Sequence, residues 1–350
     1  MRLIIRCCLL VSALWLPLSA VGAVILQYHH VSADTPASTS VTPKQFRRHL
    51  DHLDDEGFRV VPLPELVEKV RDGLDPREKV AAITFDDGYT NTWEHALPAL
   101  EKKGWKATWF ITTDKISEGD FTLSVEQLRK LQERGHTIAN HTRSHPHMVR
   151  RRDGESRKAW LKRLRDEITS AQDQLEDWLG EEPPRLLAYP YGESVPGIHE
   201  LVDELGYTAF GQHTGALGDY TDWRQAPRVA INRRYGDWDQ GLRNKVLALP
   251  LPVRSADPAD PVATDPRPAL ELELAGDWKK GQLNCFAAGQ PADISVAAEG
   301  DNTRVRVRAR QDLGEGRQRY NCTASAGEGR FYWYSRQWMR KSPSGWYPEP

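Results

Sequence analysis

Short apolar runs alternate with segments of helical periodicity from Val24 to about Leu251. This alternation is typical of a fold in which helices connect parallel strands. Eight strands are expected, over Val24–Tyr28, Arg59–Val61, Val80–Phe85, Ala107–Ile111, Thr137–Asn140, Leu186–Tyr189, Thr208–Phe210 and Arg228–Ile231. Such a series favours a closed or nearly closed (β/α) barrel, although periodicity alone leaves the closure open.

The segments between these runs carry the signals of amphipathic helices. Thr42 can cap a helix with Pro43 at its first position, and Ser124 can cap a helix that stops at Gly135. The longest segment, from about Glu155 to Trp178, repeats apolar residues at spacings of three and four. Its predicted buried face consists of Trp160, Leu164, Ile168, Ala171, Leu175 and Trp178.

The period changes to two beyond a proline-rich stretch. Residues 254–268 combine prolines with small and acidic residues, which indicates a stiff and exposed linker. After it, apolar and charged residues alternate, as in 270–274 and 304–310, with no helical pattern. We therefore predict an α/β barrel domain over residues 24–253, a linker over 254–268 and a small all-β sandwich over 269–350.

The first 23 residues have the pattern of a signal peptide. Arg2 and Arg6 supply positive charge, residues 9–18 form an apolar run, and residues 21–23 are small. We expect cleavage after Ala23 and export to the periplasm or beyond the cell, with an uncleaved anchor as the alternative. No other stretch approaches the roughly 20 apolar residues that cross a bilayer, so we expect no stable membrane span after cleavage.

Composition narrows the class of function only slightly. The 47 Lys and Arg nearly balance the 49 Asp and Glu, and a formal net charge of −2 gives no reason to expect nucleic-acid binding. After export only Cys285 and Cys322 would remain, in a compartment where they could be oxidised. The sequence leaves open whether they are bonded, and it does not indicate an oligomeric state.

Two groups of polar residues follow predicted strands and can hold a metal together. Asp86 and Asp87 come directly after the run 80–85, where the active sites of barrels are built. One carboxylate can then bind a metal while the other takes a proton. His141 and His145 follow the run 137–140, and imidazoles four residues apart on a helical turn can bind one cation. One carboxylate and two imidazoles are typical of a catalytic zinc site.

A third group, Tyr189-Pro190-Tyr191-Gly192, also ends an apolar run. Proline and glycine favour a tight loop, in which the backbone N–H of Tyr191 could point into the cavity and stabilise an oxyanion. The aromatic rings suit the face of a sugar, and we expect Tyr189, Pro190 and His29 to contact substrate. An ordinary surface turn is the alternative.

Together the segments TFDDG (84–88), HTRSH (141–145) and YPYG (189–192) resemble the polysaccharide deacetylase family, carbohydrate esterase family four. The opening LQYHHV (26–31) resembles the branch of exported poly-N-acetylglucosamine deacetylases of biofilms. The resemblance extends over roughly residues 24–235 and implies a distorted (β/α) barrel with a metal-dependent deacetylase activity.

The resemblance also implies roles for single residues. Carried over by position, Asp86 is the catalytic base, and the backbone of Tyr191 stabilises the oxyanion. Asp87, His141 and His145 bind a divalent metal, for which zinc is expected and cobalt and nickel are alternatives.

Two departures from the family pattern concern the proton donor and the arginine that orients the base. The usual late leucine-x-histidine motif is missing, which leaves His213 as the nearest substitute and His29 as a second candidate. A protonated Asp86 could instead return its proton. Ala188 stands where many members have the arginine, and Arg228 matches an arginine of the biofilm branch.

We therefore expect an exported hydrolase that removes N-acetyl groups from a polysaccharide such as poly-N-acetylglucosamine. A peptidoglycan or chitooligosaccharide deacetylase and an O-acetyl esterase are alternatives, because the motifs do not encode the sugar. A carbohydrate-binding protein with a decayed site is the alternative outside the enzymes. The aromatic segment 331–338 could either pack against protein or bind glycan.

Overall fold

The computed structural model of the protein describes residues 22–74 and 78–348. The predicted signal peptide lies outside the described residues except for Gly22 and Ala23, and Ala23 is the first residue of a buried strand. No helix within the described ranges is long and apolar enough to cross a membrane.

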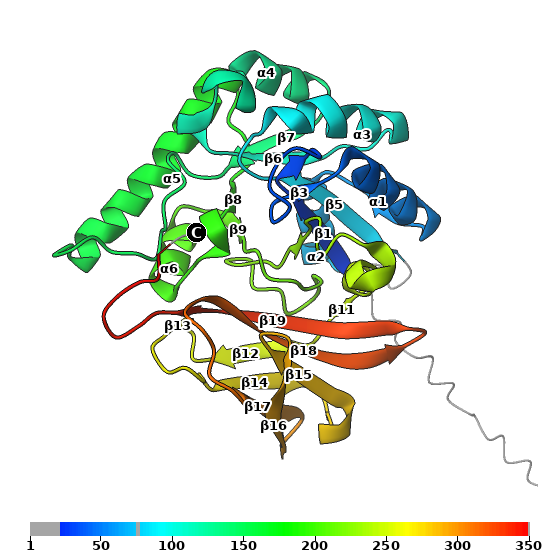
Figure 1. The fold of residues 1–350 in the computed structure, drawn as a ribbon, viewed down its shortest axis with the longest axis vertical. Coiled ribbons are helices and arrows are strands. Elements are labelled where there is room, and N and C mark those ends of the chain that lie inside the picture. Colours follow the sequence, from blue (N-terminus) through cyan, green and yellow to red (C-terminus); the bar gives the residue numbers. More distant parts are fainter. Residues whose placement is uncertain (1–21, 75–77, 349–350) are drawn as a thin grey trace, which may run out of the picture.

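A parallel sheet forms the centre of the first half of the chain (Figure 1). Each predicted strand is present, with ends within one residue of those expected. The strands are β1 (Ala23–Tyr28), β4 (Arg59–Val60), β5 (Val80–Phe85), β6 (Thr108–Ile111), β7 (Thr137–Asn140), β8 (Leu186–Ala188), β9 (Thr208–Phe210) and β10 (Val229–Ala230). Their order is β10-β1-β5-β6-β7-β8-β9, with β4 also beside β5. A short parallel pair, β2 (His30–Val31) and β3 (Ser40–Val41), lies apart from this sheet.

The barrel is not closed by a ladder between its two edge strands in the described part of the chain. The backbones of Trp223 and Ala226 bond with Ala209 of β9 instead. Every pair of neighbouring strands in the sheet is parallel, so their carboxyl ends meet at one edge, where the loops that follow them gather.

Two helices begin where the sequence predicts them, after Thr42 and after Ser124, and the longest begins at Arg157, two residues after its expected start. They are α1 (Pro43–Asp55), α2 (Leu63–Asp72), α3 (Leu97–Lys103), α4 (Val125–Glu133), α5 (Arg157–Leu179), α6 (Pro196–Glu204) and α7 (Arg243–Val246). Short helical turns are η1 (Thr92–Ala96), η2 (Thr113–Lys115), η3 (Gly119–Phe121), η4 (Pro190–Gly192), η5 (Trp238–Leu242) and η6 (Lys280–Gln282). Thr42 and Ser124 each form a capping box, which satisfies free N–H groups at the starts of α1 and α4.

Both faces of the parallel sheet are buried. All six residues of β5 are inaccessible; Ile83 and Phe85 pack in the cluster that includes α1, while Val80 and Ala82 pack with α2. A strand covered on both faces reads as a continuous apolar run, which is why the sequence shows this strand clearly.

A second, mostly antiparallel sheet follows and forms the C-terminal domain, defined here as residues 249–348 (Figure 1). Its strands are β11 (Leu249–Pro250), β12 (Val253–Asp257), β13 (Val262–Ala263), β14 (Leu270–Ala275), β15 (Leu283–Ala287), β16 (Gln290–Glu299), β17 (Asn302–Ala309), β18 (Gly316–Gly327) and β19 (Arg330–Arg340). Alternate residues of β14 and β17 are buried in a common core, as their period of two predicts.

The stretch 254–268 is not only a linker. Its first residues form β12, which pairs with β14, and Val262 and Ala263 form β13 beside β19. Proline-rich sequence tolerates such edge positions because few of its N–H groups are needed in a ladder. The second sheet thus begins at Leu249, before the expected linker.

The aromatic segment 331–338 is used for packing. Trp338 is buried in the core of the C-terminal domain, and Trp333 packs against the core of the barrel. Tyr332 and Tyr334, half-buried, pack on the core of their own domain. The structure therefore shows packing at this strand, while Trp333 and Tyr334 also line a cavity between the two domains, and glycan binding stays a prediction.

Cys285 and Cys322 face each other across β15 and β18 and form a disulfide. Replacing both with alanine should lower the free energy of unfolding by about 2–4 kcal/mol, because the bond closes a loop with a sequence separation of 37. Chemical denaturation of the purified protein measures this loss. Reduced wild-type protein is the control and should match the double variant; an unchanged unfolding midpoint would contradict the prediction.

Candidate active site

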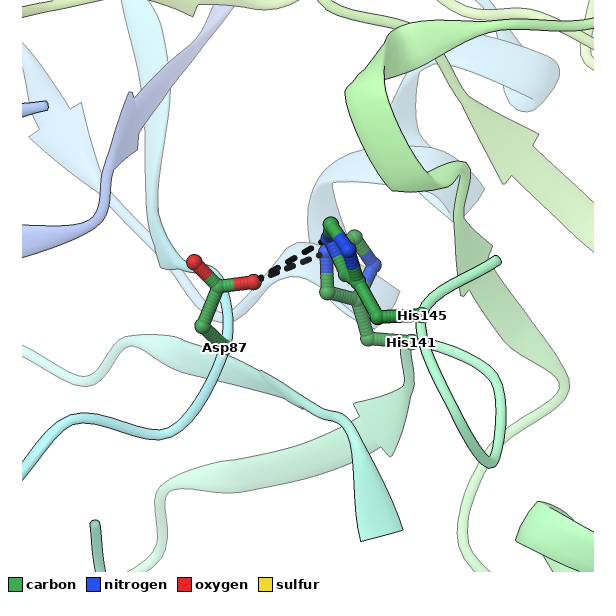
Figure 2. Close-up of side chains that lie close together, drawn as sticks. All are labelled: Asp87, His141 and His145. Carbon is green, nitrogen blue, oxygen red and sulfur yellow. Dashed lines mark ion pairs between the residues drawn. The ribbon is translucent and has the colours of Figure 1, made fainter. Parts of the chain in front are cut away.

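Three side chains from two loops converge at the carboxyl edge of the barrel sheet. Asp87 follows β5, and His141 and His145 lie in the loop after β7, with their imidazoles directed at the Asp87 carboxylate (Figure 2). The Nε2 atoms of His141 and His145 each lie 3.4 Å from Asp87 Oδ1. One ligand atom from each residue lies within 4.8 Å of the others, so a single cation can contact all three.

The residues of this cluster fit a divalent metal. Nδ1 of the buried His141 bonds with the carbonyl oxygen of Ala188 at 2.8 Å, which directs Nε2 toward Asp87. That Nε2 is buried, and apart from its 3.4 Å approach to Asp87 Oδ1 it has no polar partner among the described residues. A buried nitrogen with so little compensation is stabilised when a ligand completes it. One carboxylate and two imidazoles are a donor set that zinc accepts with positions left open.

The electrostatics also favour a positive charge here. Burial lowers the pKa of His141, but the adjacent Asp87 outweighs burial, and the pKa lies above its ordinary value. Burial, reinforced by the charge of His141, lowers the pKa of His145 to about 4. His145 is therefore neutral near pH 7, the form that binds metals.

The backbone around the cluster is held in an uncommon conformation. Asp87, Thr142, His145 and Tyr191 have φ of 74°, 67°, 57° and 60°, and the described chain holds only three other such non-glycine residues. Left-handed φ is unfavourable for side chains with a Cβ, most of all for a β-branched threonine. A backbone held in this conformation therefore needs contacts from the surrounding structure that compensate for its strain.

Two residues that sequence analysis did not select supply part of those contacts. Asn140 Oδ1 accepts from the Thr142 N–H at 2.8 Å, and the buried Glu167 of α5 accepts from both N–H and Oγ of Ser144 at 2.9 Å. Glu167 lies on the buried stripe of α5, between Leu164 and Ile168. An acid on an apolar helix face was the signal that could have identified it.

Asp86, which precedes Asp87 in the chain, forms a fully buried ion pair with Arg228. Arg228 Nη1 and Nη2 donate to the two Asp86 oxygens at 2.7 and 2.8 Å, and Gln27 Nε2 donates to Oδ2 at 2.6 Å. Both side chains of the pair have no exposure. Burial alone would raise the pKa of Asp86, but the charge of Arg228 outweighs it and brings that pKa below its ordinary value. Asp86 is therefore ionised.

The structure brings Tyr191 to the cluster but not Tyr189 or Pro190. The Tyr191 ring centroid lies 4.6 Å from that of His145, and its backbone turns left-handed within η4. Tyr189 is fully buried, its hydroxyl donating to the carbonyl of Arg224 at 2.7 Å, and Pro190 is buried beside it. The expected contact of Tyr189 and Pro190 with substrate is corrected, because neither presents a surface to a ligand.

The two proton-donor candidates lie in different places. His29 follows β1 at the same edge of the sheet, half-buried, and its charge acts on Asp86, Asp87 and His145. It makes no hydrogen bond within the described residues, so its imidazole is available to a ligand.

His213 instead lines a cavity of about 800 Å³ between the barrel and the C-terminal domain. Asp86, Asp87, His141 and His145 are not among the residues that line this cavity. Burial lowers the pKa of His213 to about 3, with Arg319 and Arg336 acting in the same direction. A neutral imidazole in this position is a poor acid near pH 7.

Comparison with known proteins supports the interpretation of the motifs. Residues 73–210, which include all three motifs, match the family model described as polysaccharide deacetylase. A putative polysaccharide deacetylase of Bacillus subtilis is 29% identical over 185 residues, which cover 52% of this chain and 61% of the relative. The poly-beta-1,6-N-acetyl-D-glucosamine N-deacetylase of Escherichia coli is 23% identical over 245 residues, which cover 60% of this chain and 36% of the relative. The chain spans less than two thirds of either relative.

Solved structures share the fold. A Streptococcus pyogenes deacetylase in complex with acetate superposes with a TM-score of 0.55 at 23% identity, covering 62% of this chain and 95% of that protein. IcaB from Ammonifex degensii gives a TM-score of 0.51 at 22% identity, covering 62% and 96%. The resemblance of the barrel domain to this family, inferred from three motifs, is confirmed.

The buried pair predicts a large loss of stability when its cation is removed. Arg228→Met should lower the free energy of unfolding by about 3–5 kcal/mol, because Asp86 is left as an uncompensated buried charge. Arg185→Met, which removes a half-exposed pair with Glu182, is the control and should cost less than about 1 kcal/mol. Equal losses in urea denaturation would show that Asp86 does not depend on Arg228.

Proposed function

Residues 73–210 belong to the polysaccharide deacetylase family, and from that premise we propose that the protein is an exported, metal-dependent hydrolase of N-acetyl groups on a polysaccharide such as poly-N-acetylglucosamine. The observation that carries the proposal is the convergence of Asp87, His141 and His145 on one point, next in the chain to the ionised Asp86. The name of the Escherichia coli relative supports the choice of polymer.

Asp87, His141 and His145 would hold the metal, with zinc preferred and cobalt or nickel as alternatives. When bound, a divalent metal supplies Lewis acidity toward an acetyl carbonyl and toward water. The chain's own contribution is to orient His141 through Ala188 and to hold the loop of His145 in place through Glu167.

Asp86 is the proposed proton acceptor. Arg228 and Gln27 fix both of its oxygens and keep it ionised. Because its side chain has no exposure, the proton must come from a molecule bound at the cluster rather than from bulk solvent. The backbone N–H of Tyr191 is the proposed donor to the developing oxyanion.

His29 is the proposed acid for the leaving amine. It lies at the carboxyl edge of the sheet, acts electrostatically on Asp86 and Asp87, and has no competing hydrogen bond in the described chain. Its position supports it over His213, which faces the cavity between the two domains.

The same groups could release acetate from peptidoglycan, from chitooligosaccharides or from an O-acetyl ester. A panel of these substrates, assayed with poly-N-acetylglucosamine for acetate release, separates the alternatives. The proposed base Asp86 and all three proposed metal ligands are present, which argues against a carbohydrate-binding protein with a decayed site.

Metal removal and two substitutions test the proposed roles. Chelation should abolish acetate release and added zinc should restore it. His141→Ala should lose bound metal. Asp86→Asn should keep it, because the three proposed ligands are unchanged, and should lose at least about a hundredfold in kcat, because the proton acceptor is removed. Since Asp86→Asn also leaves Arg228 without its buried counter-charge, urea denaturation must show that this variant is folded under the assay conditions. Metal analysis by mass spectrometry with kinetics distinguishes the two. Full metal occupancy in His141→Ala would refute its role as a ligand.

The assignment of the acid predicts a difference between two histidines. His29→Gln should lower kcat by about 10²–10⁴-fold while metal content is unchanged, since general acid catalysis typically contributes this much. His213→Gln is the matched change in the same domain. Its kcat should remain within about threefold of the wild-type value, a smaller effect than the loss of a general acid would cause. The opposite ranking in steady-state kinetics would return the role to His213.

A further inference from the structure

A buried carboxylate joins the C-terminal domain to the loop of Tyr191. Glu193 has no exposure and lies two residues after Tyr191. Its Oε1 accepts from the Tyr347 hydroxyl at 2.7 Å and from Arg317 Nη1 at 3.1 Å, and its Oε2 lies 2.9 Å from Nδ1 of His147. Two of these three partners belong to the C-terminal domain.

The charge of Glu193 depends on these partners. Burial would raise the pKa of Glu193, but His147, Tyr347 and Arg317 outweigh burial, and the pKa lies below its ordinary value. An ionised carboxylate inside a protein is stable only while its partners remain in contact. The buried carboxylate of Glu193 therefore links its loop to the C-terminal domain, because losing Arg317 and Tyr347 would leave a buried charge without partners.

Two of the same side chains also contact the ring of Tyr191. The His147 imidazole stacks on it with centroids 3.9 Å apart and planes at 6°. The guanidinium carbon of Arg317 lies 5.2 Å from the ring centroid. Arg317 thus reaches both Glu193 and Tyr191, the two residues that flank Gly192.

Gly192 is held as well. Gln337 of β19 donates to its carbonyl oxygen at 3.1 Å. Gly192 has φ of 66°, and a Cβ there would lie 2.6 Å from the backbone nitrogen of Gln212, so its position admits only glycine. The C-terminal domain therefore contacts three consecutive residues of the loop, 191 to 193.

We infer that the C-terminal domain positions the Tyr191 loop for catalysis, with Arg317 and Tyr347 as positioning residues that act through Glu193. The inference rests on the proposed function, in which the Tyr191 N–H stabilises the oxyanion. The left-handed φ of Tyr191 needs such external contacts, because the conformation is unfavourable for tyrosine. Arg317, Gln337 and Tyr347 lie outside residues 73–210, so this support belongs to the added domain.

Full-length variants test the inference. Arg317→Met removes the cation at similar length, and Tyr347→Phe removes one hydroxyl with little change in packing. We expect kcat on a short acetylated substrate to fall at least about tenfold in Arg317→Met and about threefold in Tyr347→Phe, since a small displacement of an oxyanion donor is costly. KM and bound metal should change less than twofold in both variants. Arg317→Lys should recover part of kcat, because it keeps a cation beside Glu193 and so reduces the displacement of the loop.

Arg310→Met is the matched control, because it removes an exposed pair with Asp293 in the same domain. It should leave kcat unchanged. Hydrogen–deuterium exchange of peptides covering residues 189–194 gives a readout that needs no activity: Arg317→Met and Tyr347→Phe should exchange faster there than the wild type and Arg310→Met.

Wild-type exchange in both variants, or wild-type kcat in both, would overturn the inference. A rise in KM alone would overturn it too, because Arg317 would then be a substrate contact. If the wild-type protein shows no metal-dependent acetate release, the proposed function fails, while exchange still decides whether the C-terminal domain holds the loop.

Discussion

The ion pair between Asp86 and Arg228 is the interaction on which the candidate site depends. A carboxylate without any solvent exposure stays ionised here because a guanidinium binds both of its oxygens. The pair also links the end of β5 to the residue before β10, which are 142 positions apart in the chain. Both β5 and β10 pair with β1, so the order of strands in the sheet brings these two segments together.

The metal cluster adds a second constraint, which is conformational. Asp87, Thr142 and His145, together with Tyr191, adopt left-handed φ. Asn140 and Glu167 hold the loop of Thr142 and His145 by accepting hydrogen bonds from the N–H groups of Thr142 and Ser144. Around Tyr191 the supporting contacts come from the C-terminal domain instead. The C-terminal domain is therefore in contact with the loop of Tyr191, beside the candidate site.

Much of this protein follows from local sequence. The strands were predictable because a strand covered on both faces must be continuously apolar, and the helices because capping residues precede their stripes of apolar residues. Parallel strands end at one edge, so polar residues directly after them, such as Asp87 and His141, were expected to converge. These inferences concern neighbours in the chain, where periodicity and spacing carry the information.

Contacts between distant segments were decided only by the tertiary structure. The sequence favoured His213 over His29 as the proton donor, whereas chain packing puts His29 at the carboxyl edge of the sheet, within electrostatic reach of Asp87, and His213 at the domain boundary. Tyr189 directly follows β8, where a side chain can point either into the core or toward a ligand, and spacing does not tell which. The proline-rich segment gained strand partners, and Glu193 its charge partners, from residues far along the chain. Local sequence determines which elements form, whereas partners in space depend on how the whole core packs.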